Sequence, residues 1–503
     1  MKKARKLICV ILAAMMVAMT FVPTVSAASY EKKIPHIDFR GFMSYTIYED
    51  KDKEDSKRIF PPTTESIIAT AATAVPVIGK LAIDGNWKEF GDFIIPILNT
   101  MLSPIGFGGD GEPINNSGVH FTYPTKEELE ENNMEIDFQY DWRVDPYESA
   151  AQLNDLINYL TDELGYSQVT LESHSYAGIV MLTYLSTYGT EKVKSCCFNA
   201  TAVYGAQFAG ELVKGNVTIP DEALVEFLKG LFSHNEYEDL IAAFADLLSM
   251  AGVTGFVADF VTDLFDNLSD RIWTEVVLPA LGNWPSIWAM VPDADFEEGY
   301  SNVFDNLYSN SKLDLTGLKT KIAHYSGDIR ANREDKLVAI NNSDTQLYVI
   351  ARYGYSGVPL GDIWTANTDT VLNTTAESFG ATCKAYDYNS GVIISNVAKE
   401  RYIAPNSAVD ASTCLFPDQT WFIRNCKHTQ RDDAIVEFAE TLLYSDEQAT
   451  IDTYSEYPQY LLFNAVTSDV VIDENKTPVR DSFWATLFNW LRQLFAWLSG
   501  RLK

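Results

Sequence analysis

A serine, an aspartate and a histidine occur in this chain in an order that suits nucleophilic catalysis. Ser175 lies between a short apolar run and a helical pattern, Asp369 lies in a late polar loop, and His428 follows a further apolar run. A serine hydroxyl is a weak nucleophile at neutral pH, so it needs a base within hydrogen-bond reach and an acid that orients the base. The three residues therefore predict acyl transfer through Ser175.

The residues around Ser175 predict a strand, a tight turn and a helix. Strand residues from Val169 lead into Ser-His-Ser-Tyr-Ala-Gly, and apolar residues then recur at helical spacing until Gly189. This is the shape of a nucleophile elbow, which exposes the serine hydroxyl above a sheet. Small residues are expected two positions before and after the serine, and this chain has Ser173 and Ala177 where glycines are usual.

His428 is the favoured base because the other five histidines are poorly placed. They precede the nucleophile or the acid, adjoin the serine, or lie in a predicted insertion: His36, His120, His174, His234 and His324. The order serine, acid, histidine is the one that α/β hydrolases use. Asp369 is the best placed acid, and Asp362 and Asp328 are the alternatives.

Two backbone amides are predicted to form an oxyanion hole. One belongs to Tyr176, the residue after the nucleophile. The other belongs to Phe42, because Gly41 ends an early strand and lets its loop approach the substrate closely. Amides aimed at the developing oxyanion provide a large part of this kind of catalysis.

Alternating strand and helix patterns predict an α/β fold with a mostly parallel sheet. Strands are expected within 34–44, 136–140, 169–175, 193–200, 321–327, 346–352 and 421–428. Residues 211–318 carry helical patterns without clear strands, which predicts a cap or lid insertion. The predicted organisation is a hydrolase-type core of 34–210 and 319–445, that insertion, a small appendage of 446–480, and a C-terminal helix of 481–503.

The composition and the N-terminal residues limit which classes of protein this chain can belong to. A net charge of −31 makes nucleic acid a poor partner. Residues 1–27 read as a signal peptide, with four cations before an apolar run and Val25-Ser26-Ala27 as the cleavage site, although a membrane anchor is an alternative. The sequence therefore predicts a secreted protein or one held at the cell surface. Nothing in it requires a cofactor or a metal, and a Cys414–Cys426 disulfide is left open.

The C-terminal helix predicted at 481–503 is amphipathic. Its length and interruptions are unsuited to spanning a bilayer, and its aromatic face opposite cations suits an interfacial helix. Docking on the protein itself is the alternative. The residues predicted to contact a membrane surface are Trp484, Leu487, Phe488, Leu491, Phe495 and Leu498.

Several segments together resemble the lecithin:cholesterol acyltransferase family. Tyr140-Asp141-Trp142-Arg143 closely matches the family's Y-D-W-R segment and is the most specific part. The elbow at 173–178, the loops at 40–44 and 204–210, the stretch at 284–287, Thr368-Asp369-Thr370-Val371 and Lys427-His428 also resemble family motifs, so the resemblance covers about residues 34 to 445. Aligned on Thr370-Val371, the family's acid would fall at Thr368.

The resemblance implies an α/β hydrolase that transfers an acyl group from a phospholipid or similar lipid ester, through an acyl-serine, to an alcohol or water. It also implies that Asp141, Trp142 and Arg143 hold the loops near the site without taking part in the chemistry. Two other functions stay open. One is a catalytically impaired protein that binds lipids or surfaces on the same fold, and the other is an esterase for non-lipid esters such as acylated sugars.

Overall fold

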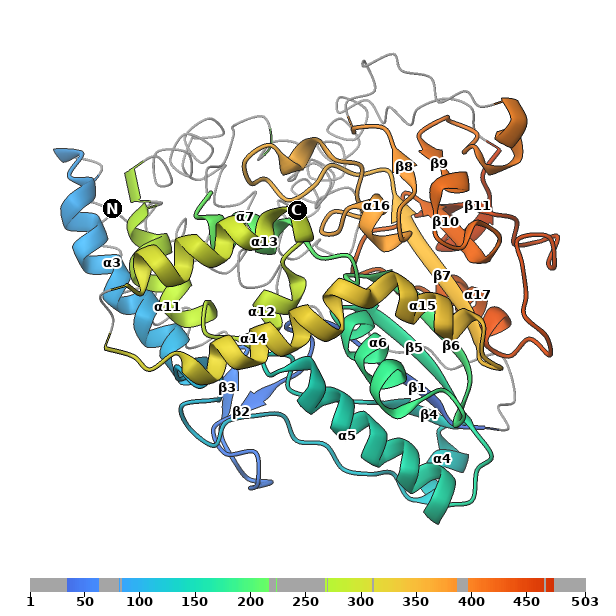
Figure 1. Cartoon of the computed structure of the whole chain (residues 1–503), viewed down its shortest axis with the longest axis horizontal. Helices are drawn as coiled ribbons and strands as arrows, with labels where there is room; N and C mark the ends of the chain where they lie inside the picture. The colour runs from blue at the N-terminus through green and yellow to red at the C-terminus, as the bar shows by residue number, and fades with distance from the viewer. Residues whose placement is uncertain are drawn as a thin grey trace, which may run out of the picture.

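The fold is described from a computed structural model of the whole chain (Figure 1). The structure describes residues 34–62, 81, 84–216, 223, 267–268, 270–309, 312–386, 397–465 and 467–474. The predicted signal peptide and the predicted C-terminal helix lie outside these residues.

An eight-stranded, mostly parallel sheet forms the centre of the molecule. All neighbouring strands are parallel except the last pair, β11 and β12. From one edge to the other the strands are β12 (Asp469–Ile472), β11 (Tyr460–Asn464), β10 (Thr420–Arg424), β7 (Gln346–Tyr353), β6 (Val193–Thr201), β5 (Val169–Ser175), β1 (His36–Phe39) and β4 (Glu135–Asp137). The chain moves outward from β1 to β4 and then returns to β5 on the other side of β1. Sites in such sheets lie beyond the carboxyl ends of strands where the order reverses.

Helices cover both faces of the sheet, as the alternation of its side chains requires. Cys196, Phe198 and Val349 join one apolar cluster with α5 (Pro146–Asn158) and α6 (Ala177–Tyr188). Cys197 and Ile350 point the other way and join a second cluster with α17 (Asp433–Leu443). The protein is therefore a layered α/β structure, as the sequence predicts.

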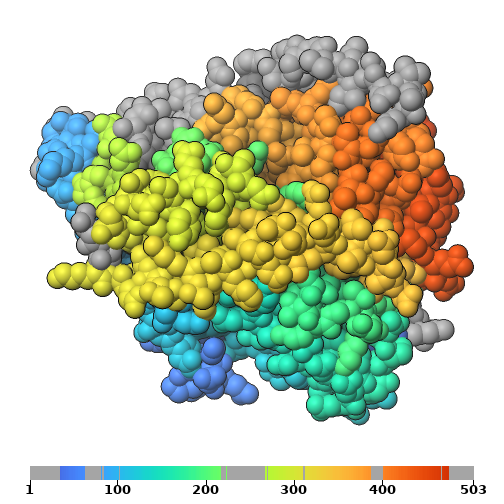
Figure 2. Space-filling model, viewed as in Figure 1, coloured from blue at the N-terminus to red at the C-terminus, as the bar shows by residue number. Residues whose placement is uncertain are grey.

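The remaining elements surround these layers. In Figure 2 the helices α13, α14 and α15 form a yellow to gold band across the visible face. The other helices are α3 (Trp87–Leu102), α4 (Lys126–Glu131), α7 (Gln207–Lys214), α11 (Leu278–Leu281), α12 (Pro285–Met290), α13 (Asp293–Tyr300), α14 (Thr316–Asp328), α15 (Arg333–Asn341) and α16 (Thr374–Glu377). Two small antiparallel pairs are β2 (Ile47–Tyr48) with β3 (Arg58–Phe60), and β8 (Thr382–Cys383) with β9 (Val409–Asp410).

The strand predicted at 321–327 is wrong, because this segment is part of helix α14. Its buried residues Leu318, Ile322, Tyr325 and Ile329 recur at three- and four-residue spacing, which places them on one face of a helix. The run Lys-Ile-Ala-His-Tyr is too short to show a period of its own, and the helical period that continues on both sides decides its structure.

The segment predicted as an appendage, 446–480, contributes two strands to the main sheet within its described residues. Strand β11 pairs in parallel with β10, and β12 pairs antiparallel with β11. The described part of the 211–318 insertion contains α11, α12 and α13 and no strand. The predicted edges of that insertion fall inside α7 and α14. The five cysteines of the described chain are free, so Cys414 and Cys426 form no disulfide here.

Candidate active site

Ser175 is held on a strained turn between β5 and α6. It has a φ of 62°, the left-handed region that a residue with a Cβ rarely adopts. Tyr176 caps the following helix, and Gly178 must be glycine because an added Cβ would lie 2.4 Å from Cβ of Thr201 on β6. The turn is therefore a strand-to-helix elbow with the serine at its apex, and backbone strain of this kind clusters at functional sites.

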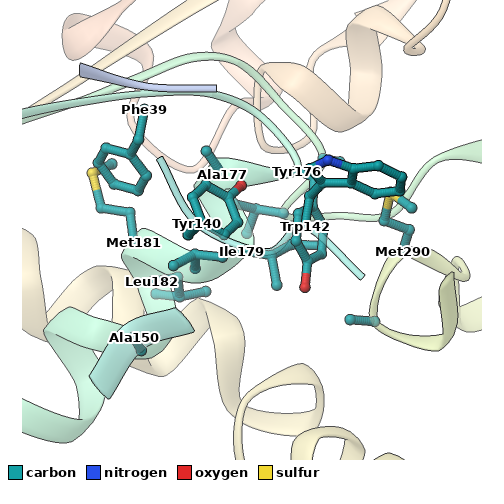
Figure 3. Packing of buried hydrophobic residues seen from close by; sticks show 14 of the residues in the cluster. Phe39, Tyr140, Trp142, Ala150, Tyr176, Ala177, Ile179, Met181, Leu182 and Met290 are labelled. Atoms are coloured by element: carbon teal, nitrogen blue, oxygen red, sulfur yellow. The ribbon is translucent and has the colours of Figure 1, made fainter. Parts of the chain in front are cut away.

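The two departures from the usual elbow glycines fit their surroundings. Ser173 is fully buried and its hydroxyl donates to the carbonyl of Cys197 over 3.3 Å. Ala177 is also fully buried, within the cluster of Phe39, Tyr140 and Met181 drawn in Figure 3. Small side chains are accommodated at both positions, so neither substitution disrupts the turn.

The loop after β1 lies directly over the serine. A Cβ added to Gly41 would lie 2.4 Å from Ser175 Cβ, 2.6 Å from Ser175 Oγ and 2.6 Å from the Tyr176 nitrogen. Only glycine permits this approach. In the described backbone, the amides of Phe42 and Tyr176 donate to no other main-chain group outside regular elements. The two amides predicted to form an oxyanion hole thus belong to segments in close contact and remain available.

Aromatic packing fixes this loop from outside. The Phe42 ring lies 5.0 Å from the Trp142 ring and 5.9 Å from the ring of Trp284, which precedes α12. The amide of Arg40 donates to the hydroxyl of Tyr45 over 2.8 Å. The described part of the 211–318 insertion therefore contacts the Gly41 loop itself.

The Asp141-Trp142-Arg143 segment ties three loops together. Arg143 donates to both carboxylate oxygens of Asp141, over 2.9 and 2.6 Å, and to the carbonyls of Ile105 and Ser117, each over 3.2 Å. Trp142 donates from its ring nitrogen to the carbonyl of Tyr45 over 2.9 Å. All three residues of the segment are buried. These contacts are the ones a structural role requires.

Asp369 and His428 are hydrogen-bonded partners on neighbouring loops. Strands β7 and β10 pair in parallel, and the loops that follow them bring Asp369 Oδ2 against His428 Nδ1. The His428 amide also donates to the Asp369 carbonyl over 2.7 Å. The second carboxylate oxygen, Oδ1, accepts the amides of Val371 and Leu372 over 2.9 and 2.7 Å. Backbone and side-chain hydrogen bonds therefore both hold Asp369 and His428 in this arrangement.

Electrostatics favour an ionised Asp369. Burial alone would raise its pKa, but the neighbouring His428 and its hydrogen bond, the adjacent Glu377 carboxyl group and the Leu372 amide together lower the pKa below its ordinary value. The charged carboxylate therefore persists at neutral pH in a fully buried position. It is suited to orient an imidazole and to stabilise the imidazolium that forms when the imidazole takes a proton.

None of the other acid candidates contacts His428 among the described hydrogen bonds. Asp328 is bonded to the Tyr147 hydroxyl and to Lys336. Asp362 lies at the start of a short 3-10 turn. The hydroxyl of Thr368, the position that the family alignment favours, donates to backbone carbonyls over 2.8 and 3.2 Å. Only Asp369 of these four residues is joined to the histidine.

The histidine lies next to the elbow through a residue that sequence reasoning assigned no role. His174, beside Ser175, has Nε2 2.8 Å from the His428 carbonyl, and the two rings lie 4.6 Å apart. Burial, then the charges of His428 and Arg352, hold the pKa of His174 well below its ordinary value. His174 is therefore neutral and donates from Nε2. Ser175 itself makes no hydrogen bond to His428 in the described structure, a contact that often forms only with substrate.

A buried polar network anchors the histidine loop. The guanidinium of Arg352 donates to the His428 carbonyl over 2.8 Å and to Asn199 over 3.1 Å. Asn199 in turn donates to Glu172 over 2.9 Å. Arg431, three residues beyond the histidine, lies 3.0 Å from Asp38 and 3.9 Å from Glu172. We call Asp38, Glu172, Asn199, Arg352 and Arg431 the anchoring network.

These anchors were missed because no local pattern marks them. Arg352 lies in the mostly apolar strand β7, whereas Glu172 lies in β5 among several polar residues, and the partners of both are distant in sequence. The arginine inside a mostly apolar strand is the one available signal, because such a charge must be paired when buried.

One group of side chains has the donor types of a metal site. A ligand atom from each of Asp369, Glu377 and His428 lies within 4.8 Å of the others. In the present arrangement, however, Asp369 Oδ2 and His428 Nδ1 bond each other, and Glu377 Oε2 accepts the Arg352 amide over 2.7 Å. A cation there would have to replace bonds that hold the pair together.

A polar cavity of about 370 Å³ lies beside the acid loop. Residues of α7 and of the segments 362–367 and 373–385 line it, including Glu211, Asp362, Asn367 and Lys384. Ser175 and His428 are not among its lining residues. The cavity therefore adjoins the loop that carries Asp369 and is not lined by Ser175.

No helix in the described ranges has the length and apolar character that crossing a membrane requires. Comparisons with known proteins gave no match: no family model, no curated protein and no solved structure is significantly similar to the chain.

Proposed function

We propose that this chain is a serine-dependent acyl-ester hydrolase or acyltransferase with an α/β-hydrolase fold. The observation that carries the proposal is the convergence of a strained Ser175 under the Gly41 loop with a hydrogen-bonded Asp369–His428 pair at the same edge of the sheet. Ser175 is the nucleophile, His428 the base, and Asp369 orients the base. Phe42 and Tyr176 supply the oxyanion amides.

The reaction needs only these groups. Ser175 Oγ bonds to the ester carbonyl carbon while His428 takes the hydroxyl proton, and the two amides hold the oxyanion. Collapse breaks the ester C–O bond, and His428 returns the proton to the departing alcohol, which leaves an acyl-serine. Water or a second alcohol then attacks, with His428 again taking the proton, and Ser175 is regenerated.

The proposed substrate is a lipid ester, and the proposed relatives are the lecithin:cholesterol acyltransferases. The sequence resemblance supports both, and the buried Asp141–Arg143 pair behaves as the resemblance implies. The helices of the 211–318 insertion are proposed to form the lid, supported by the contact of Trp284 with Phe42. Export and attachment at a lipid surface rest on the sequence of the two ends of the chain.

A fluorophosphonate probe tests the nucleophile. We expect it to label the wild type and the exposed-serine variant Ser167→Ala, and not Ser175→Ala. Ser167 lies at the other end of the same strand region, so its variant controls for nonspecific labelling. Equal labelling of Ser175→Ala would reject the proposal. The bond between Asp369 and His428 already argues against a catalytically impaired binding protein.

The polar cavity favours a second candidate, an esterase for acylated sugars. Its carboxylate, amide and lysine lining suits hydroxyl groups better than acyl chains. Product analysis separates the two candidates. A lipid enzyme releases fatty acid from phospholipid vesicles, or transfers it to an added alcohol, and Ser175→Ala does neither. An enzyme for soluble esters turns over short acyl sugars and gains nothing from vesicles.

A further inference from the structure

A second buried carboxyl group lies beside the Asp369–His428 pair. Glu377 ends the short helix α16, which follows the acid loop, and its side chain is fully buried. Its Oε2 accepts the amide of Arg352 over 2.7 Å, whereas Oε1 is buried without a close hydrogen-bond partner. A carboxyl atom of Glu377 lies within 4.8 Å of a ligand atom of Asp369 and of His428.

The charges around Glu377 decide its protonation. Glu377 faces three charged or titratable partners, which are Asp369 on the acid loop, His428, and Arg352 on strand β7. The thiols of Cys383 and Cys426 also face it. Burial raises the pKa of Glu377 well above its ordinary value, and the neighbouring Asp369 carboxylate raises it further. Burial raises the pKa of each thiol to about 12, so both are neutral.

Charge balance points the same way. The guanidinium of Arg352 is directed at the carbonyls of Lys427 and His428 and at Asn199. The Arg352 charge lowers the pKa of Glu377, but burial and the Asp369 carboxylate raise that pKa by more. A second ionised carboxylate would leave an uncompensated buried charge, and two carboxyl groups in one dry site hold a proton between them for this reason.

We propose that Glu377 is a neutral carboxylic acid that positions the Asp369–His428 pair. Its Oε1 carries a proton that is directed to the Asp369 carboxylate, while Oε2 holds the backbone of β7 from which the acid loop departs. The proton donor favours the ionised form of Asp369 and fixes its orientation toward His428. This inference rests on the proposed function, since it assigns Glu377 a role in the same site without contact to the substrate.

The test compares Glu377→Gln with Glu377→Leu. The rate of fluorophosphonate labelling is measured over a range of pH values and of probe concentrations, so that the maximal rate is separated from probe affinity. Glutamine keeps a neutral donor and an acceptor, so we expect the labelling rate of this variant to stay within about threefold of wild type. The acidic side of its pH–rate profile should not move. Leucine removes both groups, so we expect the maximal rate to fall about 10- to 100-fold with probe affinity unchanged, as for other partners that orient a catalytic group.

Three outcomes would overturn the proposal. An acid limb that moves down by about one pH unit in Glu377→Gln shows that wild-type Glu377 is ionised beside His428. A wild-type rate in Glu377→Leu shows that the group positions nothing. Loss of wild-type labelling with EDTA shows a metal held by the same side chains. If Glu377→Leu does not fold, the glutamine variant decides alone.

The same experiment separates this proposal from the function it rests on. If the probe labels the wild type no better than Ser175→Ala, both the proposed function and the proposed role of Glu377 are rejected. If wild type labels normally and Glu377→Gln shifts the acid limb, only the role of Glu377 fails.

Discussion

The side of the site that holds the proposed nucleophile and the side that holds the proposed acid–base pair are stabilised by different interactions. Ser175 and the Gly41 loop are embedded in an apolar cluster, where Phe42, Trp142 and Trp284 pack ring against ring (Figure 3 shows part of this cluster). The loops of Asp369 and His428 are held instead by buried charges and hydrogen bonds, with the anchoring network beneath them.

The difference follows from what each side has to hold in place, which is a backbone position on one side and a protonation state on the other. A nucleophile needs a backbone position, which close packing and a strained turn provide, with the buried Asp141–Arg143 pair holding the adjoining loops. An acid–base pair needs defined protonation states, and these require charged neighbours. Steric changes should therefore damage the nucleophile side, and changes of charge or pH should damage the acid–base side. The four predictions below test this division, starting from the largest effect.

Asp369→Asn should reduce the rate of ester hydrolysis or probe labelling about 10⁴-fold, because the amide leaves His428 without its orienting charge. Asp328→Asn is the matched control, because Asp328 is bonded to Tyr147 and Lys336 and not to His428, and its rate should stay within about threefold of wild type. A comparable loss in both variants would remove Asp369 from its assigned role.

Arg431→Met should destabilise the fold by about 3 kcal/mol, because it removes a cation 3.9 Å from buried Glu172 and the nearer of the two cations beside buried Asp38, whose other partner is Arg40 at 3.7 Å. Arg401→Met is the control, because Arg401 and its partners Asp418 and Asp452 are all exposed. Its cost should stay below about 1 kcal/mol. Urea unfolding of both variants measures the difference, and equal costs would show that the anchoring network contributes no more than a surface ion pair.

Gly41→Ala should slow probe labelling about 100-fold, because the new methyl group would displace Ser175 or the Tyr176 amide by the order of an ångström. Gly327→Ala is the matched control: nothing lies within 4 Å of its added Cβ, and the change is within helix α14. That variant should label at the wild-type rate and be stabilised by about 0.5–1 kcal/mol. Normal labelling of Gly41→Ala would contradict the close approach.

Glu377→Gln should alter how stability depends on pH. In the unfolded chain a glutamate titrates near about 4.3, while in the fold the pKa of Glu377 is raised. Above about pH 4.3 the unfolded state releases a proton that the native state keeps, so wild-type stability falls as pH rises, by up to about 1.4 kcal/mol per pH unit. This loss continues until the native glutamate also ionises.

Glutamine has no such proton, so the variant should gain on wild type as pH rises above about 4.3. Denaturant unfolding of both proteins at a series of pH values measures the gain. A constant difference between pH 4 and pH 8 would show that Glu377 has an ordinary pKa, and that the acid–base side holds two charges.

The part of the fold that the sequence predicts is the part where apolar residues recur at the spacing of a strand or a helix. The strands at β1, β5, β6, β7 and β10 and the helix after Ser175 were readable because each buries residues at its own period. Lys321–Gly327 and the residues of β11 and β12 were misread because a short run has no period of its own, and its neighbours in space decide whether it joins a sheet or a helix.

The sequence by itself determined the candidate nucleophile, its base and the two amides, and it favoured Asp369 among several possible acids, because elbow residues and the order of late loops are local or topological signals. That these residues perform catalysis stays a prediction. Tertiary structure alone decided that Asp369, and not Asp362, Asp328 or Thr368, meets His428. It also introduced Glu377, His174 and the anchoring network, because buried charges find their partners across the sheet, between residues far apart in the chain.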